Sequence, residues 1–159
     1  MPSPSKLDEL RRIIDNTVKD YGWFVQAVLP SSEDPSFAYS IGLLENFQHP
    51  ELIMVGFDPK LCQTLINTVG EMVRSGSKFS DGDRVQEVIQ GFPVAIREIP
   101  GPVARKWARG AANRSSGRNL ELLQIFLPDV DGKFPWEDGC NQQYVNVQGK
   151  LLGLTSTLH

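Results

Sequence analysis

The chain has 159 residues, a mass of 17.7 kDa, 40% hydrophobic residues and a formal net charge of −3. This size predicts a single globular domain over residues 1–159, with loose ends at 1–4 and 155–159. The apolar runs are shorter than the roughly 20 residues of a membrane helix and the polar start is no signal peptide, so we expect a cytosolic protein. The two cysteines lack the spacing of a zinc ribbon or a thioredoxin-type site.

The first third of the chain predicts a helix followed by two strands. Ser5 is placed to cap the helix, apolar residues recur at three- and four-residue spacings, and Gly22 ends it. Residues 23–29 and 37–43 are rich in aromatic and branched side chains, which favours two strands joined by a polar loop.

The second of these strands has one bulky face and one nearly bare face. Side chains alternate in a strand, so Phe37, Tyr39, Ile41 and Leu43 should share one side, opposite Ala38, Ser40 and Gly42. A row of small residues permits close packing by a neighbouring element, or contact with a flat ligand. Ser40 and Gly42 are therefore the first candidates for ligand binding.

His49 precedes Pro50, which disfavours helical geometry at the histidine, and Glu51 opens the strand predicted over residues 52–57. A histidine and a carboxylate this close are able to act as base and orienter, or to supply two metal ligands. The other histidine is the terminal His159, so no third ligand is visible and no metal site is predicted. A structural hydrogen bond and direct ligand contact both remain open for His49.

The middle of the chain predicts the clearest helix and a hairpin. Asp58 and Pro59 suit the first positions of a helix that ends at Gly76, and Cys62 falls on its apolar face as a core residue. Residues 84–89 and 92–99 are typical of an antiparallel hairpin.

Positive charge is concentrated between Arg97 and Arg118, a segment that contains six basic residues and one acidic residue. A helix is predicted over residues 103–113, with Arg105 and Arg109 four positions apart on one face. Such a cluster indicates either an anion-binding surface or a solvated helix face. Aromatic residues are sparse in the segment, so nucleic acid is not an expected partner.

The last part of the chain predicts strands at residues 119–127 and 144–154, separated by turns. The stretch from Pro128 to Gly132 lacks the later ligands of a calcium loop and favours a turn. Phe134 and Trp136 flank a proline, an arrangement that fits either a core plug or the roof of a pocket. Trp136, and in second place Trp107, is a candidate for stacking on a ligand ring.

Three of these motifs together resemble the domain of unknown function 4262, a mostly bacterial family. They are the run from Phe37 to Leu43, the His49-Pro50-Glu51-Leu52 strand entry, and the Leu123-Gln124 strand that leads through Pro128-Asp129 to Phe134-Pro135-Trp136. The resemblance spans roughly residues 21 to 144, and Leu127 stands where many relatives have an aromatic residue. It implies no established activity and carries over no catalytic residue.

The order of elements favours an α+β fold with a mainly antiparallel sheet, flanked by two or three helices. A small split barrel is an alternative, because flavin-binding split barrels show a similar order of strands. That analogy makes FMN or another flavin a candidate cofactor and a homodimer the natural assembly.

Two functions fit these observations. The first is a binding domain for a small anionic or phosphate-bearing ligand of flavin or nucleotide type, with the site built from Ser40, Gly42, His49, Arg105, Arg109 and Trp136. The second is a protein-interaction module, such as an immunity or antitoxin-like protein, with Arg105 and Arg109 in solvent. No nucleophile elbow, phosphate-binding glycine loop or dinucleotide fingerprint occurs, so the sequence predicts no particular reaction.

Overall fold

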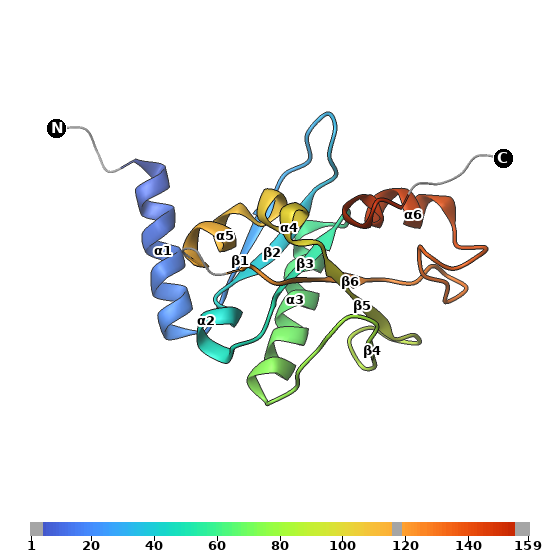
Figure 1. The fold of residues 1–159 in the computed structure, drawn as a ribbon, viewed down its shortest axis with the longest axis horizontal. Helices are drawn as coiled ribbons and strands as arrows, with labels where there is room; N and C mark the ends of the chain where they lie inside the picture. Colours follow the sequence, from blue (N-terminus) through green and yellow to red (C-terminus); the bar gives the residue numbers. More distant parts are fainter. Residues whose placement is uncertain (1–4, 116–118, 155–159) are drawn as a thin grey trace.

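The computed structural model describes residues 5–115 and 119–154, which build a six-stranded sheet with helices on both faces (Figure 1). The ends predicted to be loose, residues 1–4 and 155–159, lie outside the described residues. The helices are α1 Lys6–Asp20, α2 Leu43–Phe47, α3 Pro59–Arg74, α4 Gly101–Trp107, α5 Arg109–Ser115, α6 Gln142–Gln148 and the 3-10 helix η1 Lys150–Leu152. The strands are β1 Phe24–Val28, β2 Phe37–Ile41, β3 Glu51–Val55, β4 Arg84–Val85, β5 Val94–Ile99 and β6 Leu122–Phe126.

The strand order is β1-β2-β3-β6-β5-β4, and every pair is antiparallel except β3 with β6. This confirms the α+β fold with a mainly antiparallel sheet. The order leaves β1 and β4 as edges, so the described residues form an open sheet and not the split barrel considered as an alternative. More helices flank the sheet than the two or three expected, because several short ones occupy stretches predicted as loop or strand.

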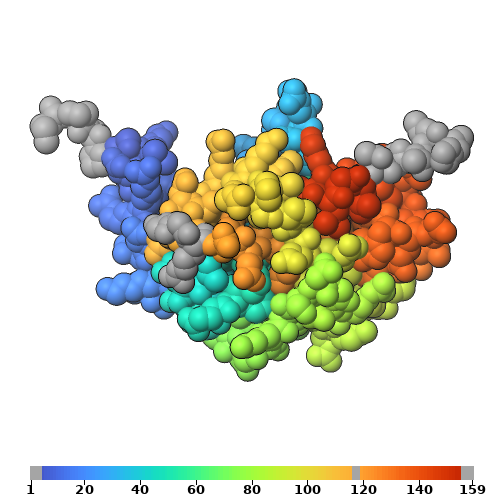
Figure 2. Space-filling view, in the orientation of Figure 1, coloured from blue at the N-terminus to red at the C-terminus, as the bar shows by residue number. Residues whose placement is uncertain are grey.

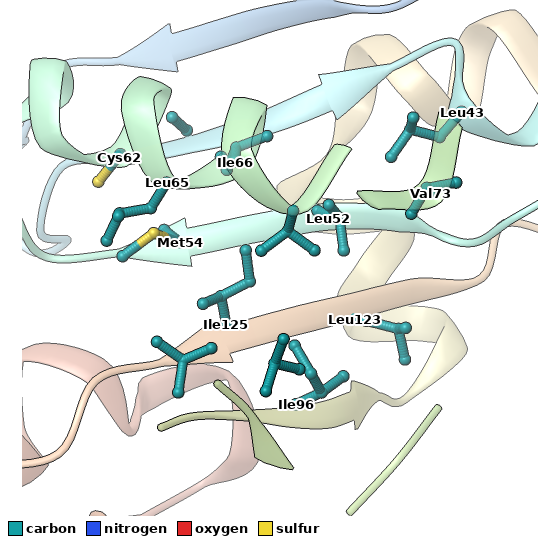
Figure 3. Packing of buried hydrophobic residues seen from close by; sticks show 14 of the residues in the cluster. Leu43, Leu52, Met54, Cys62, Leu65, Ile66, Val73, Ile96, Leu123 and Ile125 are labelled. Carbon is teal, nitrogen blue, oxygen red and sulfur yellow. The ribbon is translucent and has the colours of Figure 1, made fainter. Parts of the chain in front are cut away.

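Each face of the sheet buries its own apolar layer. The face under α3 packs Leu52 and Met54 of β3 against Cys62, Leu65 and Ile66, as Figure 3 shows. The opposite face is covered by α4 and α5 through small residues, among them Ala104 and Ala111. Since both faces of the central strands are covered, all five residues of β3 and all five of β6 are buried.

The long helix α3 forms as its sequence predicts. The Asp58 side chain accepts a hydrogen bond from the Lys60 amide at 3.0 Å, and Pro59 occupies the first turn, where no amide donor is needed. Cys62 is fully buried, which confirms it as a core residue.

The first helix is also capped as predicted, but it is only partly attached to the domain. The Ser5 side chain accepts from the Asp8 amide, and Val18 is the one buried residue of α1. Leu7 and Ile13 keep 55% and 54% of their surface exposed. The helix therefore lies at one end of the molecule (Figures 1 and 2) and docks mainly through its second half.

The strand predicted over residues 37–43 ends two residues early. Its alternation is confirmed, because Tyr39 and Ile41 pack on the α4–α5 face while Ala38 packs under α3. Gly42 then takes a φ of 122° and begins α2, which turns Leu43 onto the α3 face instead of the face predicted for it. A β-carbon at Gly42 would stand 2.7 Å from the Gly22 carbonyl oxygen, so the turn requires glycine.

Three other predicted elements differ from the structure. The helix predicted over 103–113 is split into α4 and α5 because Ala108, with a ψ of 59°, leaves the helical conformation. The strand predicted over 144–154 is wrong: Asn141 caps α6 there and η1 follows. The hairpin is confirmed, but its strands are only Arg84–Val85 and Val94–Ile99.

Candidate functional site

The carboxyl group of Glu51 is the most unusual buried group in the described residues. It lies at the start of β3, 4% exposed, beside the junction of β2 and α2. Its Oε1 accepts from the Ser40 hydroxyl at 2.7 Å and from the Leu43 amide at 3.1 Å. Its Oε2 accepts from the amides of Gly42 at 3.0 Å and Leu44 at 3.3 Å.

These four donors surround the carboxyl group because the chain turns sharply at Gly42. The turn points three consecutive backbone amides, at the start of α2, toward Glu51. The Ser40 hydroxyl also accepts from the Leu52 amide at 2.9 Å, which ties β2 to β3. The arrangement is an anion-binding nest, and the anion it holds is the protein's own carboxylate.

Burial and hydrogen bonding act on Glu51 in opposite directions. Burial removes water from the carboxylate and raises its pKa to about 7, while the hydrogen bonds from Ser40 and the three amides lower it. The net result places the protonation of Glu51 near neutral pH.

A cavity of about 260 Å³ opens above Glu51, between α2 and α5. Arg114 of α5 forms its side, with Glu45 of α2 as the partner of the guanidinium at 2.5 Å. The same guanidinium donates to Asp15 of α1. One arginine therefore joins three helices that are far apart in the sequence.

A larger cavity of about 480 Å³ lies on the other side of Arg114, between α1 and α5. It shares Ile41 and Arg114 with the first cavity, so we treat the two as one α1–α5 cleft. Its walls combine aliphatic side chains with a few polar groups: Leu7, Leu10, Arg11, Ile14, Asp15, Gln26, Ile41, Gly110, Asn113 and Arg114. In Figure 2 α1 stands at the end of the molecule beside α5.

Of the residues predicted to bind a ligand, the structure brings Ser40 and Gly42 together. Both contribute their donors to Glu51, so the groups expected to hold an external anion hold an internal one. Ser40 is fully buried and does not line either cavity. Their ligand role stays a prediction, and the packing alternative accounts for both residues.

His49 is buried apart from this network, although it is two residues from Glu51. Its Nδ1 lies 2.8 Å from the Pro50 carbonyl oxygen and its Nε2 accepts from the Phe79 amide at 2.9 Å. These partners assign a neutral ring with the proton on Nδ1. Burial also lowers the pKa of His49. His49 and Glu51 therefore have separate partners, and the base-and-orienter pair suggested by their spacing is not formed.

Arg105 and Arg109 lie on the exposed sides of α4 and α5, and neither lines the α1–α5 cleft. Trp136 is half-buried at another part of the sheet, where it stacks on Phe134 at 5.4 Å and has the Arg97 guanidinium 4.6 Å from its ring centre. The six predicted residues thus do not converge on one site in the described structure.

Trp107 is likewise half-buried and packs edge-on against Phe37 at 4.9 Å. The turn predicted after Pro128 is confirmed, because Asp129 accepts hydrogen bonds from the amides of Asp131 and Lys133.

Within the described ranges, no group of three or more histidine, cysteine, aspartate or glutamate side chains is placed to hold a metal ion. No described helix combines the length and the apolar character needed to cross a membrane.

Sequence reasoning missed Arg114 and the true partners of Glu51. Arg114 belongs to the basic segment between Arg97 and Arg118, but the four-residue spacing of Arg105 and Arg109 made those two residues the predicted anion site. A signal was present, since Arg114 follows Ala111, the buried residue of α5, by three positions and therefore shares its side of a helix.

Comparison with protein families gives one result. The family model described as "Domain of unknown function (DUF4262)" matches residues 17–141, a range that contains β1 to β6, Glu51 and Arg114. Searches of curated proteins and of solved structures find no match to this chain.

Proposed function

The chain belongs to the domain of unknown function 4262 family, whose description names no activity, and we propose from its geometry that it binds a small anionic ligand in the α1–α5 cleft. The observation that carries the proposal is Arg114, which stands between the two cavities and is held there by Asp15 and Glu45. No reaction is assigned.

The cleft has the composition of a small-molecule site. Such sites are concave, lined mainly by apolar side chains, and contain a few polar groups that orient the ligand. The larger cavity, about 480 Å³, lies within the usual range of roughly 300 to 1,000 Å³. Leu10 and Ile14 of the partly docked helix α1 form one wall, so a ligand here would cover apolar surface that the fold itself leaves open.

Arg114 keeps capacity for an anion despite its two carboxylate partners. A guanidinium has five N–H donors, and the bonds to Glu45 and Asp15 in the described structure use three of them. Arg11 adds a second positive charge to the larger cavity, and its guanidinium lies 4.0 Å from the exposed carboxylate of Asp8. The smaller cavity is acidic, with Glu45 and Glu51, so an anionic group is favoured on the side of Arg11.

This proposal moves the anion site from Arg105 and Arg109 to Arg114. The test is native mass spectrometry of the protein purified without added ligand, followed by thermal-shift titration with FMN, FAD, common nucleotides and simple carboxylates. We expect a bound mass, or a rise in Tm of several degrees, that Arg114→Met abolishes and Arg109→Met leaves intact. Each variant is compared with its own ligand-free Tm. A protein that binds none of these compounds would contradict the proposal.

A second candidate function, a protein-interaction module, is favoured by a different observation. Arg105 and Arg109 are exposed, as that function requires, and Leu7, Ile13 and Tyr21 of the α1 region keep about half of their surface in solvent. An interaction module would show no ligand response in the titration. Its own sign would be a stoichiometric protein mass bound in native mass spectra, lost in Ile13→Asp and retained in Arg114→Met.

A further inference from the structure

The apolar side chains in the walls of the α1–α5 cleft are all aliphatic. The apolar side chains that line its two cavities are Leu7, Leu10, Ile14, Ile41, Leu44 and Ala111. Among the described lining residues there is no phenylalanine, tyrosine or tryptophan. The aromatic side chains are engaged elsewhere: Trp23 with Phe47, Phe37 with Trp107, and Phe126 and Phe134 with Trp136.

This composition distinguishes between classes of anionic ligand. Proteins that hold a flavin or a nucleobase gain from stacking the flat ring on an aromatic side chain, and the cleft offers none in its described walls. Leucine and isoleucine contact a flexible hydrocarbon chain equally well from any side, because their contribution depends on buried apolar area and not on orientation.

The position of Arg114 determines the direction in which a bound carboxylate ligand would extend. It stands where the two cavities meet, so a carboxylate bound to its unused N–H groups would leave the rest of the molecule in the larger cavity. There it would lie among Leu7, Leu10 and Ile14 of α1. A hydrocarbon chain in this place would bridge α1 to the sheet and cover Leu7, which is 55% exposed.

We propose that the ligand is an aliphatic carboxylate, with its carboxylate on Arg114 and its hydrocarbon chain in the larger cavity under α1. This inference rests on the proposed ligand-binding function and narrows it. It replaces the flavin and nucleotide class expected from the sequence with a ligand that has no ring to stack. Because Nε and Nη2 of Arg114 already hold Glu45, a bound carboxylate would take the two remaining N–H groups, one on Nη1 and one on Nη2.

The test is calorimetric titration of the full chain with butanoate, hexanoate and octanoate, the corresponding alcohols, and FMN. We expect affinity for the acids to rise about fourfold for each added methylene until the cavity is full, since every methylene buries a similar apolar area. The alcohols should bind more weakly at equal length. Arg114→Met should remove the preference for the acid, and the exposed neighbour Arg109→Met should keep it.

A second variant keeps the test informative if Arg114→Met does not fold. Leu7 is exposed at the rim, so Leu7→Ser should leave the fold intact while weakening octanoate and sparing butanoate. Binding of FMN or a nucleotide without binding of the acids would overturn this inference and leave the proposed function standing. Equal affinity for acids and alcohols would overturn it too. Failure of every compound would overturn both proposals.

Discussion

Replacement of Glu51 by glutamine tests whether burial or hydrogen bonding controls this carboxyl group. The amide has the same shape, but in either orientation its NH₂ group meets at least one backbone amide of the nest, donor against donor: Gly42 and Leu44 at the Oε2 position, or Leu43 at the Oε1 position. Each buried donor left without an acceptor costs about 1–3 kcal/mol. We therefore expect Glu51→Gln to lower the free energy of unfolding by at least about 1 kcal/mol in acid, where both side chains are neutral.

The difference between the two proteins should depend on pH. Burial raises the pKa of Glu51 from 4.5 to about 7, so between these values the folded protein holds a proton that the unfolded chain has released. Stability from that proton is present below pH 4.5 and is lost as pH rises toward 7, by about 3 kcal/mol at about 1.4 kcal/mol per pKa unit. The glutamine variant lacks this loss, so the wild-type advantage should shrink over that range.

The assay is urea unfolding of both proteins between pH 4 and pH 8, followed by tryptophan fluorescence, to which the buried Trp23 contributes. Subtracting one protein from the other cancels every titrating group except Glu51. Glu98→Gln, at an exposed position of β5, is the matched control and should change the free energy of unfolding by less than about 0.5 kcal/mol. An advantage of wild type that is constant or grows with pH would refute the reasoning, because the four hydrogen bonds would then keep Glu51 ionised.

Two further substitutions test the turn and the histidine. Gly42→Ala should cost about 2 kcal/mol or more, because its β-carbon would meet the Gly22 carbonyl oxygen at 2.7 Å in addition to the strain of a φ of 122°. Gly76→Ala has a similar φ of 108° with nothing within 4 Å, so urea unfolding of this control isolates the contribution of the clash, and equal losses would contradict it. His49→Gln should weaken protection of the Phe79 amide against hydrogen exchange, because the ring Nε2 accepts that N–H. Burial lowers the pKa of His49, so the unfolded chain binds a proton on this ring more tightly than the folded protein does. His49 therefore contributes stability that is lost as pH falls below 6.5. If the free energy of unfolding of His49→Gln fell in acid as much as that of the wild type, this reasoning would be wrong.

Much of the fold was determined by local sequence pattern. The long helix α3 follows from a capping aspartate, a proline in the first turn and a broad apolar face, and it forms where predicted. The alternation of large and small residues in β2 fixed which of them face α3 and which face α4 and α5. These features are readable because each depends on residues within a few positions of one another.

The errors lie where a segment has little pattern of its own. Residues 144–154 contain branched and aromatic side chains that favour a strand, but the Asn141 cap and burial of Val145 and Gln148 place a helix there. The Gln148 side chain exchanges hydrogen bonds with the backbone of Leu127, the residue that follows β6, a partner 21 residues away. Tertiary contacts therefore overrode a weak local preference.

The candidate site shows most clearly what local sequence pattern determines and what tertiary contacts determine. The sequence by itself marked Ser40, Gly42 and Glu51 as unusual and placed an excess of positive charge between Arg97 and Arg118. Only the tertiary structure decided that Glu51 fills the nest made by Ser40 and Gly42, and that Arg114, and not Arg105 or Arg109, reaches a cleft. Composition and spacing show which side chains a chain contains. They do not show which of them meet in the fold, because partners such as Glu45 and Arg114 are 69 positions apart in the sequence.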